Sequence, residues 1–338
     1  MQQTDAATGT GPAVPWGAVR ALGGLAVLAF LVWHLGSGPF LAGLRLIDAW
    51  ALIAAVLITA VSIVACAWRW RLVALGLGLR LPLRNAVADY YRSALLNGVL
   101  PGGVLGDVHR AVDHGRDAGD VSRGIRAVVW ERTAGQVVQL TLAGALLWLL
   151  PSPVSSFMPW VVAAGVLFIA GAALLARFAP RSGPARWRRG MHTAGADIRV
   201  GLLARGTWPG VTLASAVAVG THLATFLVAA RTVGVSIPVA QLVPLALLAL
   251  LAMGIPVNFG GFGPREGVAA WAFSAAGLTA AQGVAMATVY GVLLLVSSLP
   301  GVVMLVPQVR RSWLKENDVR DTARGNVAHT GDRAPAAS

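Results

Sequence analysis

Six stretches of about 20 mostly apolar residues recur along this chain, and each is long enough to cross the hydrocarbon core of a bilayer as a helix. They are Trp16–Leu35, Ile47–Trp68, Ala127–Leu149, Phe157–Arg177, Trp208–Ala230 and Val284–Val306. Charged residues make up only 12% of the chain, against about 25% in soluble domains. Because backbone groups in lipid must be hydrogen-bonded internally, we predict an all-α fold, a polytopic transmembrane helical bundle.

The basic residues predict the orientation. Residues 69–92 carry five arginines and residues 177–205 carry seven, whereas the intervening short loops carry at most one each. Cytoplasmic loops are enriched in arginine and lysine, so the rich segments and both termini are predicted to be cytoplasmic. The same placement explains the net charge of +13 without a nucleic-acid partner. We expect a polar N-terminus (1–15), a transmembrane domain (16–307, with halves of about 16–150 and 157–307) and a disordered tail (308–338), in the inner (plasma) membrane.

The stretch "NGVLPGGVLGDVHR", Asn97 to Arg110, interrupts the apolar pattern with glycine, proline and charge. It belongs to a segment, residues 85–111, that has arginines before and after it and too many polar groups for a simple span. We predict a re-entrant hairpin that enters and leaves on the cytoplasmic side. The expected backbone turns are Pro101, Gly102, Gly103 and Gly106.

A second interruption, "PVNFGGFGPREG", runs from Pro256 to Gly267, between predicted helices at 239–257 and 265–276. The neighbouring spans predict a hairpin that dips from the opposite face, with turns at Gly260, Gly261 and Gly263. Each half then has two spans, a broken hairpin and one span, which predicts an inverted repeat of the kind that carries transport sites. A chance match of predicted topologies is the alternative.

Irregular backbone at membrane depth must be buried in protein or line a wet cavity, so the two turns predict a shared cavity. Asp107 is expected to cap the helix that carries Arg110, and Gly263-Pro264 is expected to open the helix that carries Arg265 and Glu266. Helix N-termini and arginines attract anions such as phosphate. The alternative is that both carboxylates are only caps and the two arginines only pair with them.

The stretch "WERTAGQ", Trp130 to Gln136, places charge inside a predicted span. Arg132, Gln136 and Gln139 share one helical face and are predicted to point inward, with Glu131 beside them. Charged groups at a helix centre cost about 2.5 to 3.5 kcal/mol on insertion scales, so they are expected to face protein or water. The alternative is that Arg132 snorkels and Glu131 lies at the interface.

The remaining polar residues carry weaker predictions. Cys66 is interpreted as a buried structural thiol, Tyr90 and Tyr91 as interfacial aromatics, and His34 and His222 as packed or hydrogen-bonded side chains. The spacing of His109 and His114 does not match a helical metal pair, so neither a metal site nor a cofactor is predicted.

At three motifs the chain resembles the transmembrane-domain family of lysylphosphatidylglycerol synthases, also described as flippase-like membrane proteins. "RSALLNGVLPGGVLGDVHRA" is similar to the family's Asn…Leu-Pro-Gly…Gly-Asp…Arg stretch, "ERTAGQ" to its Glu-Arg element and "NFGGFGPREG" to its late Arg-Glu element. The resemblance covers roughly residues 17–307 and implies a membrane domain that moves lipids between leaflets. No soluble synthase domain follows the last span, so lysyl transfer is not expected.

We therefore predict a lipid transporter or flippase for an anionic or phosphate-bearing lipid, including aminoacylated or polyprenyl-linked ones, and not an enzyme. No Walker A sequence is present, so the energy would come from a gradient or from lipid imbalance. The predicted substrate-binding residues are Asn97, Asp107, Arg110, Glu131, Arg132, Asn258, Arg265 and Glu266; none is assigned a catalytic role. Two alternatives are an intramembrane lipid-phosphate or glycosyl-transfer enzyme and a membrane anchor for a lipid-modifying transferase.

Overall fold

The computed structural model describes residues 44–100, 103–160, 185–255 and 262–304, together with residues 29, 33, 41, 163, 165, 167, 170 and 171. Several predictions fall wholly or largely outside these residues: the spans Trp16–Leu35 and Phe157–Arg177, both polar termini, His34, Pro101, Gly102, Asn258, Gly260 and Gly261. Every element assigned in the described residues is a helix. This confirms the predicted all-helical fold.

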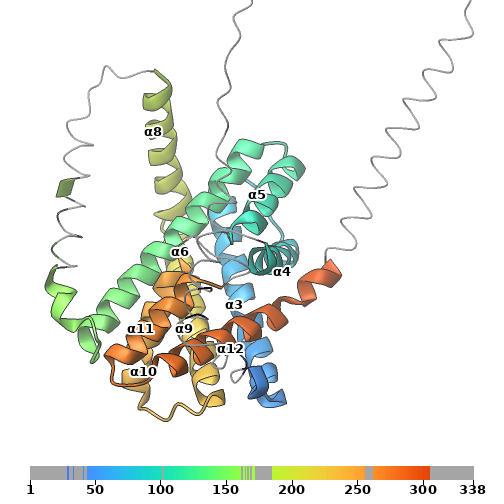
Figure 1. The fold of residues 1–338 in the computed structure, drawn as a ribbon. Coiled ribbons are helices and arrows are strands. Elements are labelled where there is room, and N and C mark those ends of the chain that lie inside the picture. The colour runs from blue at the N-terminus through green and yellow to red at the C-terminus, as the bar shows by residue number, and fades with distance from the viewer. Residues whose placement is uncertain are drawn as a thin grey trace, which may run out of the picture.

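The first half contains α3 (Ala49–Gly76), α4 (Leu83–Val99), α5 (Leu105–Asp117) and α6 (Val121–Leu149). Two of these helices begin at an aspartate cap: Asp48 accepts from the Ala51 amide and Asp120 from the Arg123 amide, both at 2.8 Å. Gly119, with φ +73°, makes the tight turn that reverses the chain between α5 and α6. The helices therefore pack against their sequence neighbours, as Figure 1 shows.

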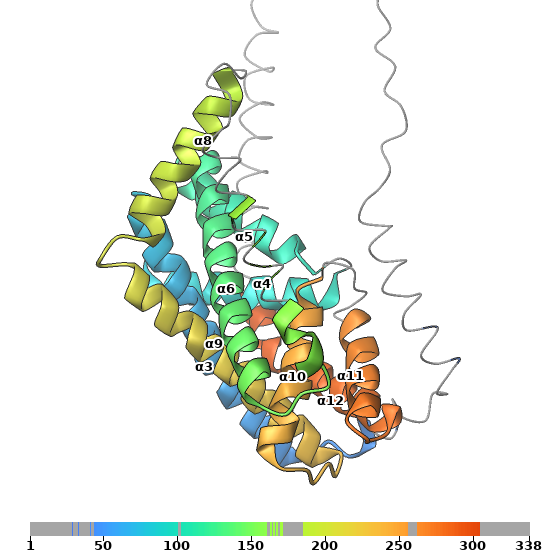
Figure 2. The ribbon, with the colours of Figure 1, turned by 90° about the vertical axis from the view of Figure 1, so that its left-hand side faces the viewer.

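The second half contains α9 (Trp208–Thr232), α10 (Val239–Met253), α11 (Pro264–Ala275) and α12 (Ala280–Ser298). Between the halves lie the short η1 (Ser155–Phe157), α8 (Ala185–Asp197) and η2 (Ile198–Leu202). The end of α8 is held to α6 by Asp197, which accepts from Arg126 at 2.8 Å and from Trp130 at 3.1 Å. The two halves meet along α3 and α9, which lie side by side in Figure 2.

Three described helices are long and apolar enough to cross a membrane: Ala49–Gly76, Trp208–Thr232 and Ala280–Met304. These match three of the predicted spans. Helix α6, predicted as a full span over Ala127–Leu149, has 29 residues but does not join this group. Its polar face, which carries Glu131, Arg132 and two glutamines, lowers its hydropathy. Together with the apolar outer surface of α3, which exposes Ile53, Leu57 and Val61, the three spans mark an integral membrane protein.

The two interrupted segments form pairs of helices that are shorter than the three spans. Helices α10 and α11 have 15 and 12 residues, or about 22 and 18 Å at about 1.5 Å per residue, against a hydrocarbon core of about 30 Å. The pair α4 and α5 breaks at the predicted place, and Gly103 adopts φ +62° there. Each pair packs together as a hairpin. The opposite membrane orientation of the two halves stays a prediction.

Helix α5 is amphipathic in the reverse sense to a helix of a water-soluble protein. In its first two turns it buries Asp107 and Arg110 and exposes Leu105 and Val108, whereas its last turn exposes Arg116 and Asp117. Such a helix is stable where the interior is polar and the surroundings are apolar. The first hairpin therefore has the surface of a membrane-embedded element.

Two apolar cores hold the halves. One gathers around Trp70 between α3, α4, α5 and α6, and the other around Phe226 and Tyr290 between α9, α10, α11 and α12. Phe226 and Tyr290 stack with ring centres 3.8 Å apart.

Candidate functional site

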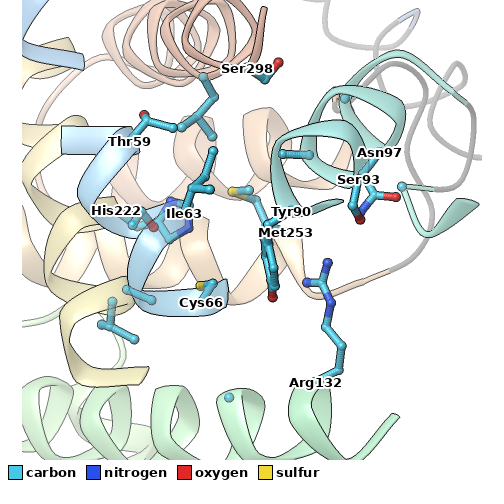
Figure 3. A pocket seen from close by; sticks show the side chains of 18 of the residues that line it. Thr59, Ile63, Cys66, Tyr90, Ser93, Asn97, Arg132, His222, Met253 and Ser298 are labelled. Atoms are coloured by element: carbon cyan, nitrogen blue, oxygen red, sulfur yellow. The ribbon is translucent and has the colours of Figure 1, made fainter. Parts of the chain in front are cut away.

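A cavity of about 330 Å³ is lined by residues of α3, α4, α6, α9, α12 and the start of α11. Its volume falls in the range of about 300–1,000 Å³ that is typical of small-molecule sites. Figure 3 shows side chains of α3, α4, α6, α9 and α12 and of the end of α10 around this space; the labelled residues are Thr59, Ile63, Cys66, Tyr90, Ser93, Asn97, Arg132, His222, Met253 and Ser298. The cavity touches all three sequence motifs, because Asn97, Arg132 and Arg265 each contribute to its wall.

Glu131 is the centre of a buried charge network beneath the cavity. Its carboxylate accepts hydrogen bonds from Arg69 Nε at 2.7 Å, from the Tyr90 hydroxyl at 2.9 Å and from Arg110 Nη2 at 2.8 Å. Arg69 also donates to the Ser215 hydroxyl at 3.1 Å. The fully buried carboxylate thus joins α3, α4, α5 and α6. Snorkelling, the alternative considered for the Glu131–Arg132 pair, is wrong for Glu131.

Asp107 holds the second part of the network. It accepts from the Ser93 hydroxyl and from Asn97 Nδ2, both at 3.0 Å, and pairs with Arg110 and Arg132. The prediction that Asp107 caps α5 is wrong, because the carboxylate turns toward α4 and α6 and the cap position is held by Val104, which makes no side-chain hydrogen bond. Asn97 replaces part of the cap, since its Oδ1 accepts from the Gly106 amide at 2.8 Å.

The network carries an excess positive charge. Three guanidinium groups, from Arg69, Arg110 and Arg132, face the two carboxylates of Asp107 and Glu131. A charge removed from water is costly unless it is paired, so one further anion would complete this set. The cation that faces open space is Arg132, whose side chain remains 44% exposed although it pairs with Asp107.

Arg110 is the buried guanidinium of this set and packs against two aromatic rings. It is 2% exposed, and its guanidinium lies 4.6 Å from the Trp70 ring centre and 4.1 Å from that of Tyr90. Cation–π contacts of this kind stabilise a desolvated cation. Tyr90 is therefore buried against a charge, and its interpretation as an interfacial aromatic is wrong.

Arg265 also lines the cavity and pairs with its neighbour Glu266. Glu266 Oε2 accepts from the Gly263 amide at 2.7 Å, so this carboxylate caps α11, which begins at Pro264 as predicted. The Arg265 guanidinium lies 5.1 Å from the Tyr290 ring centre. Its own charge is balanced by Glu266, which agrees with the pairing alternative for this second constellation.

Glycines make room for the arginines. A Cβ at Gly135 would lie 2.6 Å from Arg69 Nη1, and one at Gly291 would collide with Arg265 Nη2. Gly106 is required for a different reason. A Cβ there would overlap the Ser93 carbonyl, because the backbones of α4 and α5 are in contact. These positions need the absence of a side chain rather than a special φ.

The structure brings most of the predicted residues to one place. Asn97, Arg132 and Arg265 line the cavity, Arg110, Glu131 and Glu266 are buried, and Asp107 borders a neighbouring groove. Gln136 and Gln139 also face the cavity, which confirms the predicted polar stripe. Their roles toward a substrate stay predictions.

Sequence reasoning missed two participants: Arg69, which was placed in a cytoplasmic segment, and Tyr90, which was interpreted as an interfacial aromatic. The interpretation of His222 as a packed or hydrogen-bonded side chain is confirmed, because its Nδ1 lies 2.7 Å from the Tyr290 hydroxyl. Its place in the cavity wall was not predicted. The available signal for Arg69 was its place between two tryptophans in a continuous helix. Cys66 also lines the cavity instead of being fully buried. In the part of the chain that the structure describes, no cluster of three histidine, cysteine or acidic side chains could hold a metal ion.

A comparison with protein-family models finds one that covers most of the chain: residues 17–301 match the model described as "Lysylphosphatidylglycerol synthase TM region". A search of curated proteins finds no match.

Proposed function

The chain belongs to the lysylphosphatidylglycerol synthase TM region family, and from this premise we propose that it is a carrier that moves an anionic, phosphate-bearing lipid between the leaflets of the plasma membrane. The family description names a lipid metabolite, so lipid handling is the natural role for a relative. The carrier binds the lipid in one leaflet and releases it in the other, and it performs no covalent chemistry.

The half-exposed Arg132 carries the proposal. It stands in a cavity among membrane helices, and the network behind it has one positive charge more than its carboxylates balance. A phosphate oxygen would accept a charge-assisted hydrogen bond from this guanidinium. Hydroxyl and amide groups around the cavity, such as Ser93, Asn97 and Gln136, would bind a polar headgroup.

The fixed ion pairs support a positioning role for the buried residues. Glu131 and Asp107 hold Arg69, Arg110 and Arg132 in place before any ligand arrives, and preorganised groups lose less entropy on binding. The headgroup would enter the polar cavity while the acyl chains stay in an apolar environment.

Transport by the purified protein in liposomes tests this function. The probe is phosphatidylglycerol with a fluorescent label on its headgroup or on one chain. A membrane-impermeant reductant added outside quenches the label in the outer leaflet, so further quenching measures movement from the inner to the outer leaflet. We expect transport above protein-free liposomes, and a loss of at least about tenfold in Arg132→Gln, because one charge-assisted hydrogen bond contributes about 1.5–3 kcal/mol. Arg123→Gln is the matched control, since that arginine is exposed on the same helix and pairs with Asp120 at the surface. Equal rates in the wild type and Arg132→Gln would refute the proposal.

The orientation, with both termini in the cytoplasm, is part of the same proposal. The arginine-rich segments 69–92 and 177–205 support it. Arg69 does not count toward this argument, because it pairs with the buried Glu131. Cys66 is the chain's single cysteine, so a Cys66→Ala background allows one cysteine at a time to be introduced. A thiol reagent confined to the outside should label a cysteine at Val233 and spare one at Arg80; the reverse pattern would overturn this orientation.

A further inference from the structure

A second hollow of about 450 Å³ runs between α5 and α6. It shares four lining residues with the polar cavity: Gly103, Arg132, Gln136 and Met253. The two spaces are therefore neighbours, and the Arg132 side chain stands where they meet. We call this second hollow the α5–α6 groove.

The groove is polar at one end and apolar along the rest. Asp107, Arg132 and Gln136 lie at the end next to the cavity. The remaining wall is mainly aliphatic and comes from both helices: Val108, Ala111 and Val112 of α5, and Ile125, Val128 and Val129 of α6. Val108 and Val129 are also exposed at the outer surface, so the groove is open to the surroundings of the bundle.

The length of the groove matches one leaflet. Its α6 wall extends from Ile125 to Gln136, or about 16 Å at about 1.5 Å per residue. That is about half of a hydrocarbon core of about 30 Å. A water-filled hollow of this composition would be unfavourable, because apolar walls bind apolar matter in preference to water.

We propose that the α5–α6 groove binds one acyl chain of the lipid whose phosphate is held at Arg132. This inference rests on the proposed function and extends it: the substrate is a chain-bearing lipid bound through head and tail together, not a free phosphate or a soluble headgroup. The excess positive charge at one end and the aliphatic wall beyond it are complementary to such an amphiphile. The groove keeps the chain solvated by apolar groups while the headgroup occupies the polar cavity.

Photo-crosslinking locates the chain. The full protein is placed in phosphatidylcholine bilayers with a small amount of phosphatidylglycerol that carries a diazirine near the end of one acyl chain, and labelled peptides are identified by mass spectrometry. We expect label at Val108 and Val129 in excess of label at Val137 and Leu140, two exposed residues of α6 that serve as lipid-facing controls. Unlabelled phosphatidylglycerol should compete, and glycerophosphoglycerol, which lacks chains, should compete at least about tenfold less well.

Variants separate the bound chain from bulk lipid. Arg132→Gln should lower the groove label toward the control level, and Val129→Trp, which fills the groove from an exposed position, should abolish it while Leu140→Trp has no effect. The detergent unfolding midpoint of each variant reports whether it is folded. Equal labelling of groove and control positions, or groove labelling that Arg132→Gln leaves unchanged, would overturn the inference. A groove free of label but cross-linked to another segment or copy of this chain would do so as well.

The transport assay distinguishes this inference from the proposed function. If Val129→Trp transports at the wild-type rate and Arg132→Gln does not, the carrier stands and the acyl-chain site is refuted. If the wild type does not transport but groove labelling depends on Arg132, the binding site stands and the carrier is refuted.

Discussion

Replacement of Glu131 by glutamine tests whether the buried network is held by charge. In the wild type the carboxylate is fully buried and accepts from Arg69, Tyr90 and Arg110. In Glu131→Gln, Arg110 keeps the carboxylate of Asp107 as a partner, but Arg69 is left with neutral acceptors alone among its described contacts, the new amide oxygen and the Ser215 hydroxyl. One buried guanidinium is then left without a counter-charge.

The expected cost is about 3–5 kcal/mol, the usual effect of removing one partner of a buried pair. The midpoint and slope of unfolding in increasing sodium dodecyl sulfate, followed by tryptophan fluorescence in mixed micelles, measure it. Asp120→Asn is the matched control: the Asp120–Arg123 pair is exposed, and asparagine caps a helix about as well as aspartate, so the change should stay below about 1 kcal/mol.

A double variant identifies the physical cause. Glu131→Gln with Arg69→Met removes the uncompensated cation together with the carboxylate and returns the network to one excess positive charge. Replacing both members of a buried pair is often close to neutral, so the double variant should be more stable than Glu131→Gln by about 2 kcal/mol or more. The reasoning is refuted if Glu131→Gln unfolds within about 1 kcal/mol of the wild type, or if the double variant is no more stable than the single one.

Three further predictions use the same unfolding measurement. Gly106→Ala should destabilise by about 1–3 kcal/mol, because its Cβ overlaps the α4 backbone, whereas Gly144→Ala, which has open space in α6, should be neutral or stabilising by up to about 1 kcal/mol; equal effects would contradict the close-packing explanation. Tyr290→Phe should cost about 1 kcal/mol through the lost hydrogen bond to His222, and no change would show that this bond contributes nothing. Burial lowers the pKa of His114, so protonation favours the unfolded state and stability should fall as pH drops below about 6.5; His114→Gln should lose less stability between pH 7.5 and 5.5, and an unchanged pH dependence would exclude His114 as its source.

The local pattern of the chain determined the class of the protein and the position of its breaks. Three features carried this information: apolar runs of membrane-spanning length, breaks at Gly103 and at Gly263-Pro264, and arginines between the runs. All three are short-range features, and the rules that link them to helices and turns are local. The predicted helix start at Pro264 agrees with this, because a cap needs only its own first turn.

Only the tertiary structure decided which charges meet. Arg69 and Glu131 are 62 residues apart in the chain and form a buried ion pair; no periodicity or motif predicts this pairing, because it depends on how α3 and α6 pack. The same packing drew Asp107 from its expected cap toward Arg132 and placed Tyr90 under Arg110. The sequence identified polar residues that cannot face lipid. Which partner each of them finds depends on how all the helices of the bundle pack together, so the pairs follow from the fold alone.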